Sequence, residues 1–305
     1  MKRTSKRLNI YFFPLFISII AGLAIVAIIL SFADEDHLST LIPAVIVGII
    51  IIYYIYLKLT KKRRKVDQAL SKRFPKNWKF FMLQYVAFYN GLGSKEKKKF
   101  EKDVQTFLAE KEITPIDCSI NEYDRLLVAS SAIIPIFGFG NFDYPMLDEI
   151  LIYPQQFNND YQTDGVDRNI LGMVGNGVMN RKMILSLPAL RASFMYKGTS
   201  SNVGIHEFSH LIDGYDGATD GIPRLLLEKQ YIVPWLDIMH KEIQKIQEGK
   251  SDINPYGATN QQEFFAVASE YFFSRPDMME DEHKELYDMM VQIFKQKPNL
   301  YINQS

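Results

Sequence analysis

The sequence predicts an α+β domain preceded by a two-helix transmembrane hairpin. Two long runs without charged residues near the N-terminus predict the hairpin. Amphipathic helix patterns mixed with short β-rich segments predict the domain, and the stretch from His206 to His210 predicts a metal site within it. We expect residues 1–66 to form the hairpin with its basic flanks, and residues 67–305 to form the domain.

The two apolar runs are long enough to cross a bilayer. Neither Leu8–Ala33 nor Leu38–Leu57 contains a charged residue, and each reaches the ~18–20 residues that a span requires. The expected spans are therefore about 8–33 and 38–59, joined by a short acidic turn. A cleaved signal peptide fits poorly, because a second apolar run follows the first. Two buried core helices are the alternative, although charge-free runs of this length are rare in water-soluble cores.

Charge is distributed unevenly and predicts the orientation of the hairpin. Residues 1–66 hold ten Lys or Arg and three acids, a net charge of +7, so the rest of this neutral chain carries −7. The positive residues lie at both outer ends, which the positive-inside rule places in the cytoplasm. We expect a multi-pass protein of the cytoplasmic (inner) membrane whose domain faces the cytoplasm. A single cysteine, Cys118, excludes an intrachain disulfide and suits that compartment.

Helices and strands are expected to alternate irregularly upstream of the metal motif. In order, they are a basic helix or linker at 61–74, amphipathic helices at about 94–111 and 121–134, and strands at 149–153 and 182–187, with loops at 158–160 and 172–177. The acidic balance of this domain argues against nucleic acid as a partner. A strand just upstream of the motif can offer an exposed edge to an extended peptide and lay its scissile bond over a metal.

The stretch His206-Glu207-Phe208-Ser209-His210 has the spacing of a metal site. Residues four apart lie on one helix face, so His206 and His210 can present both imidazoles to one ion. Glu207 lies beside the first ligand, where it could take a proton from a metal-activated water. Residues 200–202 offer N-cap candidates and Gly214 can end the helix. The competing interpretation is a pair of polar-rim histidines, but two of only five histidines would then match the motif by chance.

A catalytic zinc site needs a third protein ligand while one position stays open. His240 and His283 are candidates, and so are several carboxylates. Residues 263–273 form an apolar helix pattern whose two carboxylates, Glu263 and Glu270, are seven apart and share a face. A carboxylate there is costly unless it is paired or bound to a metal. Spacing alone does not choose which of them is a ligand, and rim positions paired with Lys or Arg fit equally well.

Together these segments resemble the Mlc titration factor A family of zinc peptidases. The resemblance is carried by residues 206–213 (HEFSHLID), Gly221-Ile222-Pro223, Tyr256 and residues 263–273 (EFFAVASEYFF), and it covers most of residues 80–280. It implies a zincin-type fold similar to the catalytic domain of anthrax lethal factor, in which a glutamate is the third ligand.

The resemblance implies a role for each matching residue. His206, His210 and Glu263 would hold Zn²⁺, and Glu207 would act as the base. Tyr256, seven residues before Glu263, would donate to the oxyanion of a tetrahedral intermediate. The implied activity is hydrolysis of peptide bonds in a peptide or protein substrate by a zinc-activated water.

The hairpin departs from the soluble members of that family and leaves the partner open. Those members are linked to binding a sugar-responsive transcriptional repressor. Two hypotheses follow: a membrane-anchored zinc metallopeptidase, or a membrane-tethered regulatory protein that binds such a partner and has weak or vestigial peptidase activity. Asp213, three residues beyond His210, is a candidate either to hold a ligand imidazole or to cap and pack the helix end.

Overall fold

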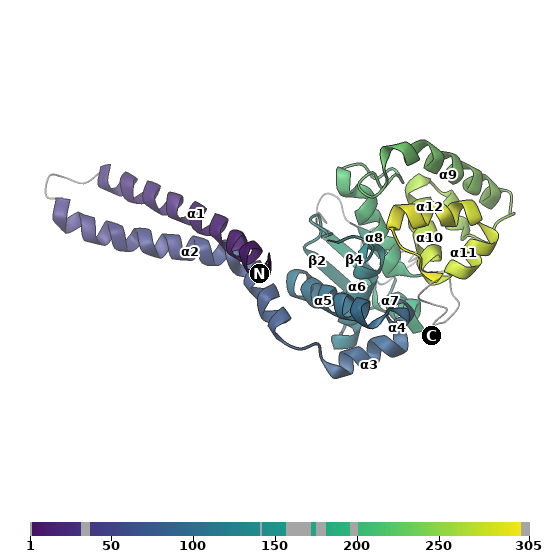
Figure 1. The fold of residues 1–305 in the computed structure, drawn as a ribbon, viewed down its shortest axis with the longest axis horizontal. Coiled ribbons are helices and arrows are strands. Elements are labelled where there is room, and N and C mark those ends of the chain that lie inside the picture. Colours follow the sequence, from purple (N-terminus) through teal and green to yellow (C-terminus); the bar gives the residue numbers. More distant parts are fainter. Residues whose placement is uncertain are drawn as a thin grey trace. The chain divides into compact units, whose positions relative to one another are not determined.

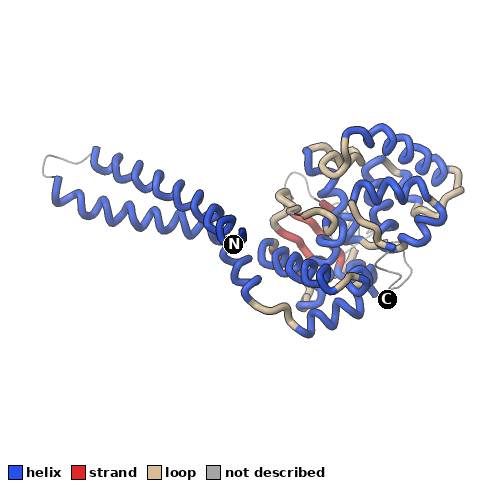
Figure 2. Tube along the Cα trace, in the orientation of Figure 1, coloured by secondary structure: helices blue, strands red, loops and turns tan. Residues whose placement is uncertain are grey.

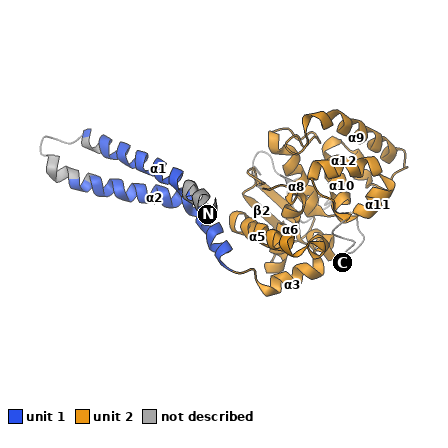
Figure 3. Cartoon of the chain, viewed as in Figure 1, with its two compact units in different colours: residues 1–72 blue, residues 73–305 orange. Residues whose placement is uncertain are grey.

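The computed structural model describes residues 2–31, 37–140, 142–156, 172–174, 181–195 and 201–299. The chain divides into two compact units, Met1–Lys72 and Arg73–Ser305 (Figure 3). The division lies a few residues beyond the expected boundary at 66, because helix α2 (His37–Ser71) continues to that point. The assignment of the two units to membrane and cytoplasm remains a prediction.

The first unit consists of helices α1 (Lys2–Ser31) and α2, which run antiparallel (Figure 1). The Tyr11 hydroxyl donates to Asp67 Oδ2 at 2.6 Å, so the first half of α1 lies beside the last third of α2. Within the described part of the chain, one helical stretch, Tyr11–Ile28, is long and apolar enough to cross a membrane by length and composition. A membrane role for α2 is taken up below as a proposal.

The second unit is mostly helical and contains one sheet, so its class is α+β as expected (Figure 2). Its helices are α3 (Lys76–Tyr85), α4 (Ala87–Gly91), α5 (Ser94–Glu110), α6 (Glu122–Ile136), α7 (Leu187–Met195), α8 (Val203–Asp213), α9 (Ile232–Gln247), α10 (Gln261–Ser274), α11 (Pro276–Glu282) and α12 (Lys284–Phe294). Short 3-10 turns are η2 (Gly214–Asp216), η3 (Lys229–Tyr231) and η4 (Pro255–Ala258). The strands are β1 (Glu112–Pro115), β2 (Glu149–Tyr153), β3 (Gly172–Val174) and β4 (Lys182–Ser186).

The helices expected at 94–111 and 121–134 correspond to α5 and α6, and α6 begins at the expected Asn cap. The Asn121 side chain accepts hydrogen bonds from the backbone N–H groups of Tyr123 and Asp124. The strands expected at 149–153 and 182–187 are β2 and β4. The loop expected at 158–160 lies outside the described residues.

The sheet has the order β1-β2-β4-β3, with β1, β2 and β4 parallel and β3 antiparallel to β4. The expected loop at 172–177 is therefore wrong over its first three residues. The sequence Gly172-Met173-Val174 is too short and too close to further glycines to stand out as a strand, and its strand conformation comes from antiparallel pairing with β4. Because β3 covers β4, the strand that ends the sheet next to α8 is β3 and not β4.

The main core lies between the sheet and the helices that carry the motif. Met183 and Leu185 of β4 belong to that core together with Phe208 of α8. Ile184, which points the other way, packs with Leu151 in a small separate cluster. Helix α8 packs against α6, α10 and the β3–β4 edge, so the core fixes it between the sheet and α10 (Figure 1).

Candidate metal centre

Helix α8 presents His206 and His210 on the face that meets α10. Asn202 begins the helix, since its side-chain oxygen accepts the Ile205 N–H at 3.0 Å. Gly214 ends it and donates its N–H to the last carbonyls. The apolar positions of α8 are buried, whereas the imidazoles of His206 and His210 are 12% and 14% exposed. The four-residue spacing therefore produces two neighbouring imidazoles at the edge of the core.

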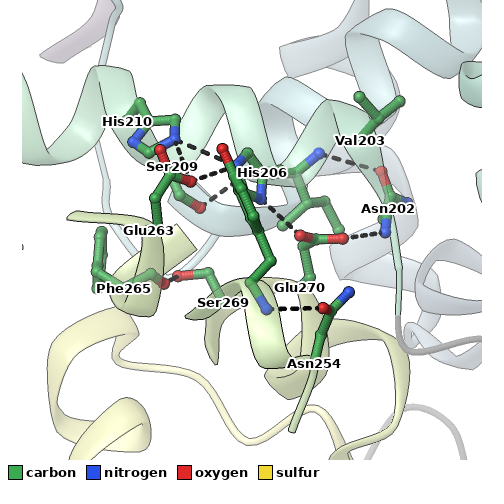
Figure 4. Close-up of polar contacts among 12 residues, drawn as sticks. Asn202, Val203, His206, Ser209, His210, Asn254, Glu263, Phe265, Ser269 and Glu270 are labelled. Atoms are coloured by element: carbon green, nitrogen blue, oxygen red, sulfur yellow. Dashed lines mark hydrogen bonds and ion pairs between the residues drawn. The ribbon is translucent and has the colours of Figure 1, made fainter. Parts of the chain in front are cut away.

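Helix α10 brings Glu263 to the same point (Figure 4). Glu263 lies in the first turn of α10, where its N–H donates to the capping side chain of Asn260 at 2.9 Å. Its Oε2 atom lies 3.1 Å from His206 Nε2 and 3.5 Å from His210 Nε2, and the two Nε2 atoms are 3.2 Å apart. Ligands about 2.0–2.1 Å from one tetrahedral zinc ion are separated by roughly 3.3 Å, so this triangle has the size that zinc requires.

The hydrogen bond behind His206 makes the donor set suitable for a cation. Glu270 Oε1 lies 2.6 Å from His206 Nδ1, so this nitrogen carries a proton and donates it. A neutral imidazole with a protonated Nδ1 directs a lone pair from Nε2 toward Glu263 and His210. Three acceptor atoms facing one another at these distances repel unless a positive charge lies among them. The residues present therefore fit a metal ion, and His206, His210 and Glu263 are the cluster of the described residues that could hold one.

The pKa values of His206 and Glu263 also indicate a site that favours positive charge. Burial lowers the pKa of His206, but hydrogen bonds to Glu263 and Glu270 raise it well above its ordinary value. When no metal ion is bound, a proton between these groups plays the same part: burial raises the pKa of Glu263, but hydrogen bonds and charge interactions with His206 and His210 outweigh it and hold the pKa at about 2. The site thus combines an ionised carboxylate with a field that favours positive charge between the ligands.

Glu270 lies on the other side of the His206 ring, outside the triangle of Nε2 and Oε2 atoms. Its second oxygen, Oε2, accepts the N–H of Asn202 at 2.6 Å (Figure 4). The carboxylate thus ties together the start of α8 and the imidazole of His206 one turn later. Spacing left open which of Glu263 and Glu270 faces the metal, and the structure places Glu263 at both Nε2 atoms.

Glu207 and Tyr256 flank the cluster from different elements. The Glu207 side chain is buried, at 4% exposure, and burial raises the pKa of its carboxyl group. Tyr256 lies in η4, where the Asn254 side chain accepts its N–H at 3.0 Å. Tyr256 as a whole is 52% exposed, and its ring lies 6.1 Å from the His206 ring, centroid to centroid. Burial and the nearby Glu263 raise the pKa of Tyr256, so its phenol is a neutral donor at pH 7.

The other candidates lie elsewhere. Asp213 accepts the Gly221 N–H at 2.8 Å, an interaction that ties the end of α8 to the following loop, and burial raises its pKa to about 6. His283 lies between Glu242 and Asp252, at 2.7 Å from each. His240 contacts Gln261 at the surface. Neither His283 nor His240 belongs to the cluster formed by His206, His210 and Glu263.

Comparison with known proteins relates most of the chain to one family. Residues 58–295 match the model of the glucose-regulated metallo-peptidase M90 family. An uncharacterized protein of Synechocystis is 29% identical over 273 residues, which cover 85% of this chain and 98% of the relative. Mlc titration factor A of Escherichia fergusonii is 28% identical, covering 72% of this chain and 86% of the relative. The protein of the same name from Pectobacterium atrosepticum is 26% identical, covering 68% and 82%.

Proposed function

This chain belongs to the glucose-regulated metallo-peptidase M90 family, which includes relatives named Mlc titration factor A, and on that premise we propose that it is a membrane-anchored zinc metallopeptidase. The observation that carries the proposal is the triangle formed by His206 Nε2, His210 Nε2 and Glu263 Oε2, with edges of 3.1–3.5 Å. Three protein ligands leave one coordination position open, as catalytic zinc sites require.

Each site residue has a task that follows from its position. His206, His210 and Glu263 would hold a zinc ion, whose Lewis acidity would polarise a peptide carbonyl and acidify water. Glu207 is the general base: its buried carboxylate accepts a proton from the attacking water and returns it to the leaving amine. The Tyr256 hydroxyl donates a hydrogen bond to the oxygen that becomes negatively charged. Glu270 keeps the His206 ring in its ligand orientation.

The sheet offers a place for the substrate backbone. In the described residues β3 pairs with β4 on one side, and it ends the sheet beside α8. An extended peptide that pairs with the outer edge of β3 would pass close to Glu207 and the metal ligands. We therefore propose an extended peptide segment as the form of substrate that is bound.

The first unit supports a membrane anchor with the spans 8–33 and 38–59. Both helices expose large apolar side chains, among them Phe12, Phe13, Leu23, Ile46, Ile49 and Ile50. The helices approach closely at two glycines: a Cβ on Gly22 would lie 2.1 Å from Ile52 Cγ1, and one on Gly48 would lie 2.5 Å from Val26 Cγ2. Small residues at the helix contact and large apolar residues outside it are typical of helices packed in lipid. The basic ends of the pair favour a cytoplasmic position for residues 67–305.

A second candidate function comes from the names of the relatives. Proteins named Mlc titration factor A suggest that a family member can bind a regulator. We accordingly retain a membrane-tethered regulatory protein, which binds a partner such as a transcriptional repressor and has weak or vestigial peptidase activity, as the alternative.

One experiment separates the two functions. The full chain and its Glu207→Gln variant are purified in detergent micelles, and zinc content and peptide cleavage are measured with and without a chelator. A peptidase predicts bound zinc in both proteins and chelator-sensitive cleavage that falls roughly 10²–10⁴-fold in the variant. Equal, chelator-insensitive cleavage by both proteins would contradict it. A pull-down and a cellular assay with the same two proteins test the alternative. If partner capture and the cellular phenotype survive Glu207→Gln, binding is the function. If the phenotype vanishes, catalysis is the function.

A further inference from the structure

We propose that Gly172, on edge strand β3, is a positioning residue for the base Glu207. The missing side chain at position 172 leaves the space in which the Glu207 side chain lies. This inference rests on the proposed function, because Glu207 is its general base. It adds a residue that neither the metal motif nor the third-ligand helix contains.

The contact between the two residues is close. A Cβ atom added to Gly172 would lie 2.6 Å from both Cγ and Oε1 of Glu207, and 2.8 Å from Cδ. All three of the heavy atoms nearest to that Cβ belong to Glu207. Carbon atoms that are not bonded prefer about 3.5–4.0 Å, so a side chain at position 172 requires a shift, and we expect the Glu207 side chain to be what moves. Because Glu207 is buried, its side chain cannot avoid the clash simply by rotating into solvent.

The pleat of the sheet explains why the contact is directed at Glu207. Gly172 pairs with Leu185 and Met173 pairs with Ile184. Leu185 belongs to the main core beneath α8, whereas Met173 packs with Ile184 on the opposite face of the sheet. Since neighbouring residues of a strand point to opposite faces, a side chain at position 172 would point toward α8. Strand β3 thus places Gly172 directly beside Glu207, where there is no room for a side chain.

Backbone conformation does not account for this glycine. The glycines with positive φ among the described residues are Gly217, Gly221 and Gly249, and Gly172 is not one of them. An alanine can adopt the backbone conformation of Gly172, and what it meets there is the Glu207 carboxylate. The requirement for glycine at position 172 is therefore a requirement for space.

Two consequences distinguish this role from a general need for a well-packed strand. First, Gly172→Ala should move the base and leave the zinc content at the wild-type value. The three atoms nearest to the added Cβ all belong to Glu207 and none belongs to a proposed metal ligand. Second, the cost of Gly172→Ala to stability should depend on the side chain at position 207. Removing that side chain with Glu207→Ala opens the space that the new methyl group needs.

The experiment is a double-mutant cycle on the full chain in detergent micelles at fixed zinc concentration. Thermal unfolding midpoints are measured for the wild type, Gly172→Ala, Glu207→Ala and the double variant. Gly172→Ala is expected to lower the midpoint by several degrees in the wild-type background and by none in the Glu207→Ala background. Gly140→Ala is the matched control, because a Cβ at Gly140 has nothing within 4 Å, and it should leave the midpoint unchanged in both backgrounds.

Activity provides the second readout. Gly172→Ala is expected to lower kcat/KM about 100-fold at unchanged zinc content, because a shift of about 1 Å of a catalytic group can cost that much. An equal loss of thermal stability in both backgrounds, or wild-type activity in Gly172→Ala, would overturn the inference. A wild-type chain that cleaves no peptide would contradict the proposed function instead, and the thermal cycle would still decide whether Gly172 makes room for Glu207.

Discussion

At the scale of single residues, the candidate metal site is defined by spacing and completed by geometry. The four-residue spacing of His206 and His210 was enough to predict two imidazoles on one face, since helix geometry is local. Spacing alone cannot predict the separate tasks of Glu263 and Glu270, because a separation of seven residues places both on the same face of α10. Their difference arises from where α8 crosses α10, which brings Glu263 to the Nε2 atoms and Glu270 to Nδ1 of His206.

Glu270 should tune the metal site without being a ligand. We expect Glu270→Gln to weaken zinc binding about 10–100-fold, because the amide is a poorer acceptor for the His206 Nδ1–H and cannot stabilise the imidazole as a carboxylate does. Zinc affinity measured by competition with a chromophoric chelator checks this. Glu228→Gln, at an exposed position, serves as the control and should bind zinc as the wild type does. An unchanged affinity in Glu270→Gln would leave Glu270 with a purely structural role.

Tyr256 should affect the rate and not the metal. We expect Tyr256→Phe to lower kcat roughly 10²–10³-fold at unchanged zinc content, since it removes one hydrogen-bond donor to the oxyanion. Steady-state kinetics with metal analysis of the same samples provides the measurement. Tyr215→Phe, at another part-exposed tyrosine, is the control. If the two variants cleave at the same rate, Tyr256 has no part in the chemistry.

At the scale of elements, what the sequence predicted best were segments with a strong local pattern. Helices α5 and α6 have apolar residues at helical spacing, and α6 also has an asparagine cap. Strand β3 was missed because three residues carry no periodicity and its identity as a strand depends on pairing with β4. The position of Gly172 opposite Glu207 follows from that pairing, so the sequence alone could not predict it.

A largely buried ion network joins α9 to the start of α12, and its contribution to stability depends on pH. His283 is bonded to Glu242 of α9 and to Asp252, which also accepts a hydrogen bond from the Tyr271 hydroxyl. Burial lowers the pKa of His283, but the hydrogen bonds to the two carboxylates raise it above its usual 6.5. A raised folded-state pKa means that protonated His283 stabilises the fold fully below pH 6.5 and that this stability is lost as pH rises through the folded pKa.

We therefore expect wild-type stability to fall as pH rises above 6.5, and His283→Asn to remove most of that dependence. Urea unfolding midpoints of the full chain at pH 6, 7 and 8.5 measure the effect. His240→Asn, at an exposed histidine, should retain the wild-type dependence. The same slope in wild type and His283→Asn would show that the network does not titrate in this range.

At the scale of the whole molecule, the chain joins two units of opposite composition. Residues 1–66 carry a net charge of +7 and both long apolar runs, and the remainder carries −7 and the candidate metal site. This division was visible in the sequence because composition is a sum over long segments and needs no knowledge of contacts. The order of strands in the sheet was not visible, since it depends on pairing between distant segments.

The proposed topology predicts which ends of the hairpin are accessible from outside. In a Cys118→Ser background, a membrane-impermeant thiol reagent added to intact cells should label Glu35→Cys, between the two expected spans, and spare Ser305→Cys, at the end of the chain. Labelling after lysis should reach both cysteines and is the control for reactivity. The opposite pattern in intact cells would place the metal site on the outer side of the membrane.

The central claim is that two elements distant in sequence, α8 and α10, build one zinc site. Its most direct test is the zinc content of the full chain after dialysis, compared with that of Glu263→Ala and of the exposed control Glu228→Ala. We expect one zinc ion per chain in the wild type and in Glu228→Ala, and a loss of tightly bound zinc in Glu263→Ala. Wild-type zinc content and affinity in Glu263→Ala would contradict the claim.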